Sequence, residues 1–152
     1  MTPESWILRS VCTWIIDGSL KPYAIGIGAA LIFPTVPRSF IDWTFEELEK
    51  NNVALALVEG KWVDRGLMFQ AVPKQHVKLA YVRFMGIRDL QVFDRVQRPQ
   101  DEVLELWTQQ IAALKADEVW VYTDNYLEGF APATANKIKA FLDLPVTEPA
   151  AL

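Results

Sequence analysis

Three short apolar runs along the chain have the length and pattern of buried strands. They occupy residues 53–59, 78–85 and 118–123, and a glycine or a polar residue follows each one. Runs that are apolar along most of their length are typical of strands covered on both faces. Helical patterns lie between these runs, and this alternation indicates an α/β fold with a parallel sheet. We expect the three strands to be parallel neighbours in sequence order.

Two helices are predicted in the second half of the chain. The first spans about 100–115, with Pro99 at the position of its first turn. Its apolar residues recur at intervals of three and four: Val103, Leu104, Trp107, Ile111 and Leu114. The second helix spans about 133–142, between Pro132 and Pro145. Trp107 and Trp120 are both expected in the core.

The first half of the chain has a less regular pattern. Apolar residues at helical spacing predict an amphipathic helix over 5–16, and the apolar run 24–33 fits a buried strand, although its small residues also allow a helix. Thr44 and Glu47 have the spacing of a capping box, which predicts a short helix over 45–50. Residues 60–77 show no helical period and are expected to form a long loop.

Composition and charge exclude several classes of partner. The chain has 152 residues, of which 51% are hydrophobic and 22% charged, as in a single folded domain. A net charge of -4 argues against a nucleic-acid-binding protein, whose usual mark is a basic face. The longest uncharged run, residues 23–33, is shorter than the ~20 residues of a membrane-spanning helix. We therefore expect neither nucleic acid nor a membrane as a partner.

Cysteine and histidine each occur once, as Cys12 and His76. One cysteine cannot form a disulfide within the chain, and a single residue of each type cannot build a Cys/His zinc site. We predict no metal and no cofactor. Glu4 and Arg9 interrupt the apolar N-terminal stretch, which argues against a secretory signal. A cytoplasmic protein is expected.

From about Arg38 onward, several segments follow one another in a recognisable order. They are Arg38-Ser39-Phe40, VALALVE at 53–59, AYVRFMG at 80–86, Trp107 with Ile111, and VWVYTDNYLEGFAPATANKIKAFLDLP at 119–145. The last segment is the most specific, because an aromatic strand followed by a polar pair, glycine, Ala-Pro and an alanine-rich helix is an unusual combination. On these residues the chain resembles the family called domain of unknown function 72, or YecE-like.

The resemblance implies a TIM-barrel-like fold, of which this chain would hold only the C-terminal half. A complete barrel takes ~250 residues, too many for this sequence. The expected fold is therefore an α/β half-barrel with a parallel sheet of about four strands. Residues 1–37 are expected to form an atypical N-terminal segment and 38–152 the half-barrel. The sequence also departs from the family pattern, with Asp124 in place of one of two asparagines and Glu59 in place of an aspartate.

Candidate site residues follow from the rule that barrels bind ligands at the carboxyl ends of their strands. Glu59 and Asp124 are the candidate catalytic carboxylates, for proton transfer. Arg83, Asn125 and Trp62 are the candidate ligand-binding residues. Each has an alternative: Glu59 as a solvated carboxylate, Arg83 in a structural ion pair with one of the two acids, and the polar pair 124–125 in turn formation. Trp62 lies in the long loop, where it could line a pocket.

Two functions remain open from the sequence. The first is a truncated YecE-like barrel without a complete active site. The alternative is a ligand-binding or hydrolase-like enzyme with a polar site at the strand ends, and a small anionic ligand for Arg83. The run 119–123 would be an unpaired sheet edge without lysine or proline, which favours a homodimer through exposed edges.

Overall fold

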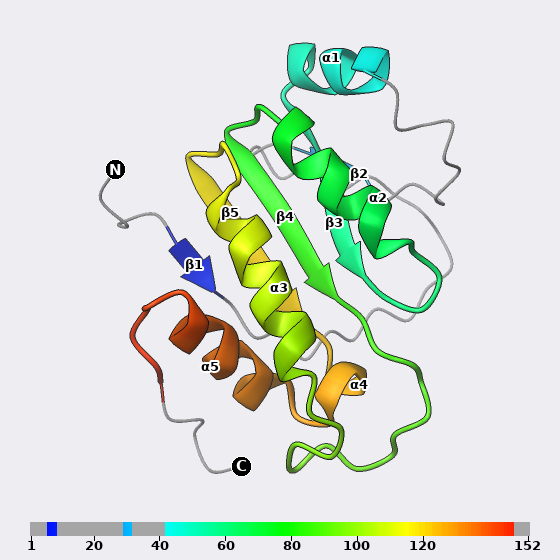
Figure 1. The fold of residues 1–152 in the computed structure, drawn as a ribbon, viewed down its shortest axis with the longest axis vertical. Helices are drawn as coiled ribbons and strands as arrows, with labels where there is room; N and C mark the ends of the chain where they lie inside the picture. The colour runs from blue at the N-terminus through cyan, green and yellow to red at the C-terminus, as the bar shows by residue number, and fades with distance from the viewer. Residues whose placement is uncertain (1–5, 9–28, 32–41, 148–152) are drawn as a thin grey trace.

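The three apolar runs form parallel neighbouring strands in the computed structural model, which describes residues 6–8, 29–31 and 42–147 (Figure 1). Two three-residue strands flank them, so the sheet has the order β1-β5-β4-β3-β2. The strands are β1 Trp6–Leu8, β2 Ala29–Leu31, β3 Val53–Glu59, β4 Leu79–Phe84 and β5 Glu118–Thr123. The helices are α1 Asp42–Lys50, α2 Arg65–Ala71, the 3-10 helix η2 Val72–Lys74, α3 Asp101–Ala112, α4 Asn125–Glu128 and α5 Ala131–Phe141.

The predicted fold class and strand order are confirmed. Glu59 lies opposite Phe84, and Phe84 lies opposite Thr123, so the carboxyl ends of β3, β4 and β5 are level. The strand number differs from the expected four, because the sheet has three strands of six or seven residues and two of only three.

One face of the sheet packs against the helices, and Figure 1 shows α2 and α3 in front of the strands. In β4, every second residue is fully buried on this face: Ala80, Val82 and Phe84. Trp107 and Ile111 of α3 pack against them and are also fully buried, as the helical spacing predicts. Trp120, expected in the core, is only half-buried, because its position in β5 faces away from this cluster.

The N-terminal residues that the structure describes form strands. Trp6–Leu8 is a strand, so the helix predicted over 5–16 is wrong at these positions. This strand pairs with Val119 to Val121, and the edge of β5 is therefore covered there, contrary to expectation. Ala29–Leu31, within the run 24–33, pairs with β3. The rest of both segments, with Cys12, lies outside the described residues.

Two helical predictions near the middle of the chain need correction. Helix α1 begins at Asp42, so Thr44 is inside the helix and does not cap it. The expected loop over 60–77 contains α2 and η2. Asp64 caps α2, because its carboxylate accepts a hydrogen bond from the backbone N–H of Leu67 at 2.9 Å. None of the helices within the described ranges is long and apolar enough to cross a membrane.

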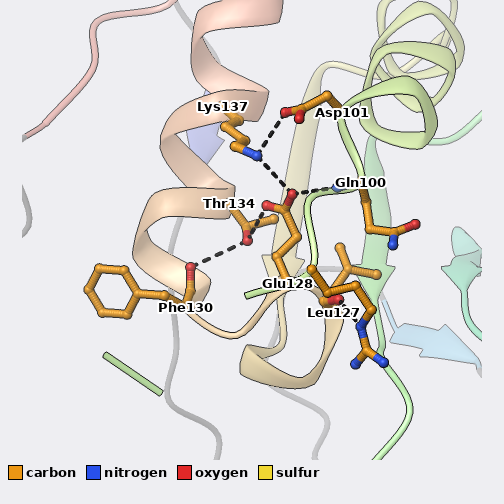
Figure 2. A network of polar contacts seen from close by, with 8 residues as sticks. Gln100, Asp101, Leu127, Glu128, Phe130, Thr134 and Lys137 are labelled. Atoms are coloured by element: carbon orange, nitrogen blue, oxygen red, sulfur yellow. Dashed lines mark hydrogen bonds and ion pairs between the residues drawn. The ribbon is translucent and has the colours of Figure 1, made fainter. Parts of the chain in front are cut away.

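A buried carboxylate joins the last helices to the start of α3 (Figure 2). Glu128 has no solvent exposure. It accepts hydrogen bonds from the Gln100 backbone N–H at 2.8 Å, the Thr134 hydroxyl at 2.7 Å and the Lys137 ammonium at 2.9 Å. Lys137 also contacts Asp101 at 2.7 Å. This network fixes α4 and α5 relative to the loop that leaves β4.

Candidate functional site

A cleft of about 350 Å³ lies at the carboxyl ends of β3 and β4, and we call it the strand-end cleft. Its polar lining consists of Glu59, Lys61, Arg65, Arg98 and Gln100. Its apolar lining comes from side chains of the loops that follow the two strands, including Val63, Met85 and Ile87. Three cations and one carboxylate therefore line this cleft, in a chain whose net charge is -4.

Glu59 is held by three nitrogen donors inside this cleft. Arg65 donates from Nε at 2.7 Å and from Nη2 at 2.8 Å, and Trp107 donates its indole N–H at 2.5 Å. The hydrogen bonds from Arg65 raise the pKa of that guanidinium, mainly through this contact with Glu59. A carboxylate has about four acceptor positions, and here three are in use. Glu59 therefore acts as a structural anchor between β3, α2 and α3.

Arg98 fixes the loop between β4 and α3. Its guanidinium donates to the backbone oxygens of Tyr126 at 2.8 Å and Leu127 at 3.2 Å. It also pairs with both carboxylate oxygens of Asp89 at 3.0 Å, and this contact lowers the pKa of Asp89. Gly86 allows the close approach of this loop to α4, because a Cβ at its position would lie 1.7 Å from the backbone oxygen of Tyr126.

The polar pair at 124–125 caps two helices. The carboxylate of Asp124 accepts a hydrogen bond from the backbone N–H of Tyr126 at 3.0 Å, at the start of α4. The side-chain oxygen of Asn125 accepts from the backbone N–H of Ala131 at 2.7 Å, at the start of α5. Neither side chain lines the strand-end cleft.

Arg83 and Trp62 also lie outside the lining of the cleft. Glu59 is in register with Phe84, so Arg83, one residue earlier, points to the opposite face of the sheet. The ion pair between Arg83 and Glu59 or Asp124, which the sequence left open, is not formed among the described residues. Trp62 follows β3 and is 66% exposed. Of the five predicted site residues, the cleft contains only Glu59.

The three cationic side chains of the cleft are not among the site residues predicted from the sequence. Lys61 follows Gly60 in the loop after β3, and Arg65 opens α2 directly after its cap, Asp64. Arg98 stands before Pro99, whose pattern predicts only the start of a helix. These residues lie in loops or at a helix end, where no hydrophobic period marks them. The cap at Asp64 was the signal that could have identified α2, and with it Arg65.

No group of three or more potential metal ligands occurs in the described part of the chain. His76 lines a larger, open depression at the opposite end of the sheet, together with Glu49, Lys78 and Lys115. Its ring lies 3.9 Å from the Glu49 carboxylate. His76 precedes β4, so it lies at the end of the sheet opposite the strand-end cleft.

The fold and the strand-end cleft define a parallel α/β protein related to barrels, with a polar hollow where such folds bind ligands. The family model described as "Protein of unknown function DUF72" matches residues 37–151, and the chain belongs to this family. The resemblance drawn from the sequence is thereby confirmed.

Comparison with solved structures agrees with this assignment. The crystal structure of a DUF72 family protein from Enterococcus faecalis V583 matches with a TM-score of 0.54 and 15% sequence identity. The match covers 82% of this chain and 51% of that chain, so our chain spans about half the length of this relative. At this identity the likeness shows the fold alone. No curated protein matches the chain.

Proposed function

We propose that this chain is a non-catalytic half of a DUF72 barrel that binds a small anionic ligand in the strand-end cleft. The observation that carries the proposal is the cleft itself, in which Lys61, Arg65 and Arg98 outnumber the single carboxylate, Glu59. An excess of positive charge in a concave site attracts carboxylate or phosphate groups. The match to 51% of a DUF72 relative supports the interpretation of residues 38–152 as half of a barrel.

Lys61 is the cation best placed to bind an anion. Arg65 already pairs with Glu59, and Arg98 with Asp89. Lys61 has no ion-pair partner within the described ranges, and its side chain is exposed at the cleft. An incoming anion would therefore contact Lys61 without breaking an existing pair, while Glu59 and Asp89 offset the charges of the two arginines.

We infer that the chain is non-catalytic from the contacts of the two carboxylates that are predicted to transfer protons. Glu59 accepts three hydrogen bonds, and Asp124 caps α4 outside the cleft. A general acid or base has to reach its substrate and exchange a proton with it. The Glu59 carboxylate is already engaged by Arg65 and Trp107, and Asp124 is outside the cleft. Neither the hydrolase-like alternative nor a particular substrate is favoured by these contacts.

The test is a titration of the protein with inorganic phosphate and with citrate, followed by amide NMR. We expect shifts confined to residues around 59–65, 86–87 and 97–100. Lys61→Ala should weaken binding about fivefold, the loss of one exposed charge contact of ~1 kcal/mol. Lys115→Ala is the matched control, because Lys115 lines the depression at the other end of the sheet. Shifts away from the cleft, or equal weakening by both variants, would reject the proposal.

A further inference from the structure

Main-chain contacts hold the guanidinium of Arg98 in place beside the strand-end cleft. Its Nε donates to the backbone oxygen of Leu127 at 3.2 Å, and its Nη2 donates to that of Tyr126 at 2.8 Å. The backbone N–H of Arg98 donates to the backbone oxygen of Glu128 at 3.0 Å. Arg98 is therefore tied to α4 at three points, and each acceptor is a backbone oxygen.

The terminal nitrogens of Arg98, which we call the Arg98 fork, bind one carboxylate. Nη1 donates to Oδ2 of Asp89 and Nη2 donates to Oδ1, each at 3.0 Å. This two-point contact is the geometry in which arginine recognises carboxylates. The hydrogen bonds from Arg98 lower the pKa of Asp89, and the positive charge of Lys61 adds to this effect. Arg98 and Lys61 thus act on the same carboxylate.

The two cations and the carboxylate differ in their position relative to the cleft. Arg98 and Lys61 line it, whereas Asp89 is not among the described residues of its lining. The Asp89 carboxylate therefore reaches the Arg98 fork from the loop outside the cleft. A ligand inside the cleft would approach the same two cations from the other side.

Asp89 is held weakly compared with Arg98. Its side chain is 51% exposed, and it lies within residues 85–100, which contain no helix or strand. Its backbone N–H donates within the loop, to the oxygen of Ile87 at 2.8 Å. The loop contacts α4 on both sides of Asp89, through Gly86 and through the ring of Phe93. Because an exposed ion pair contributes little to stability, Asp89 can leave the fork while the loop keeps these contacts.

We propose that the Arg98 fork is a carboxylate-binding subsite of the strand-end cleft, and that Asp89 competes with the ligand for it. The ligand first contacts Lys61, and one of its carboxylates then takes the place of Asp89 with both oxygens on Arg98. This inference rests on the proposed anion site. It adds the chemical class of the ligand, a carboxylate, and a residue that weakens its binding.

The exchange keeps the hydrogen bonds of the guanidinium intact. One carboxylate replaces another of the same charge and shape, so both fork nitrogens retain an acceptor. The contacts with the backbone oxygens of α4 hold the fork in one orientation, so little side-chain freedom is lost on binding. What the ligand has to overcome is the contact between Arg98 and Asp89. Asp89 therefore lowers the affinity of the subsite and is not required for it.

The test compares citrate binding by the wild type and by Asp89→Ala, followed by amide NMR and by the Nε–H signal of Arg98. We expect Asp89→Ala to bind citrate about fivefold more tightly, because a competing exposed charge contact is removed. The Arg98 signal should shift on saturation with citrate in both proteins. Asp89→Asn takes the place of the alanine variant if that variant does not fold.

Asp94→Ala is the matched control, because Asp94 lies in the same loop and pairs with Arg95 at 3.5 Å. Neither residue is among the described lining of the cleft. This variant loses the same charge at a solvent-screened position, so we expect its affinity for citrate to stay within about twofold of wild type.

The outcomes separate this inference from the proposed anion site. If the wild type binds citrate in the cleft and Asp89→Ala binds it equally well, the inference is wrong and the anion site stands. An equal gain in Asp89→Ala and Asp94→Ala has the same meaning. If neither the wild type nor Asp89→Ala binds citrate, both proposals are wrong.

Discussion

At the scale of single residues, Glu59 shows how a strand-end acid can be structural. The carboxylate joins three elements through Arg65 and Trp107, and its side chain is only 13% exposed. The indole N–H of Trp107, a fully buried residue, needs an acceptor, and Glu59 provides it. The position that the sequence marked for proton transfer is therefore one on which the packing of α3 depends.

Replacement of Glu59 by glutamine tests this structural role. Glu59→Gln keeps the shape and one acceptor oxygen, but it removes the charge that binds Arg65. We expect the free energy of unfolding to fall by about 1–2 kcal/mol, because a partly buried, charge-assisted contact is lost. Urea denaturation measures this change.

The matched control for this prediction is Glu105→Gln on α3. Glu105 is exposed, so the same loss of charge should change the free energy of unfolding by less than about 0.5 kcal/mol. Equal urea midpoints for wild type and Glu59→Gln would show that Glu59 is not an anchor, and would return it to the list of candidate acids.

At the scale of elements, Glu128 holds α4 and α5 against the start of α3. Its carboxylate has no solvent exposure and contacts Lys137, which also contacts the half-exposed Asp101 (Figure 2). Glu128→Gln leaves Lys137 beside a buried neutral group. We expect a loss of about 2–3 kcal/mol in the free energy of unfolding, because the charge-assisted hydrogen bonds to a fully buried carboxylate are lost and Lys137 keeps only Asp101 as an anionic partner.

Asp101→Asn removes the other anion from the same lysine. The Asp101 side chain is 55% exposed, so we expect a loss of no more than about 1 kcal/mol. Native-state hydrogen exchange should show faster exchange of α5 and of residues 97–100 in Glu128→Gln only. If both variants lose the same stability, the buried oxygen contacts of Glu128 do not determine how these helices pack.

Element length separates the parts of this fold that the sequence predicts from those that it does not. Strands β3, β4 and β5 and helix α3 have enough residues for their hydrophobic period to be recognised. Strand β1 has three residues, and its conformation depends on pairing with β5, which no local pattern encodes. Helix α2 has seven residues and carries Gly66 in its first turn. Such short elements form through tertiary contacts rather than through their own propensity.

The sequence predicts where the candidate site lies, but not which residues line it. The rule of strand carboxyl ends located the cleft and selected Glu59. It could not tell that Arg83 points to the other face, because this depends on the register between β3 and β4. It also could not select Arg98, which reaches the cleft from the loop between β4 and α3, fourteen residues after the end of β4.

At the scale of the whole molecule, the edges of the sheet bear on whether a second copy of the chain can pair with it. The edge strands β1 and β2 have three residues each, and they cover part of β5 and β3. Short edge strands offer few free backbone groups to another chain. This arrangement weakens the argument for a homodimer through sheet edges, which assumed that residues 119–123 were unpaired.

We therefore expect sedimentation velocity at micromolar concentrations to show a monomer of 17.3 kDa. The reason is that β1 and β2 pair with part of β5 and β3, so the sheet edges leave few free backbone groups for a second copy. The homodimer remains the competing prediction, and a concentration-dependent shift toward twice the monomer mass would support it. Tyr122→Lys then separates the two routes to a dimer. It would abolish a dimer formed through the sheet face that carries Tyr81 and Tyr122, whereas a dimer formed through the strand edges would persist, because the backbone groups that join such edges do not depend on this side chain.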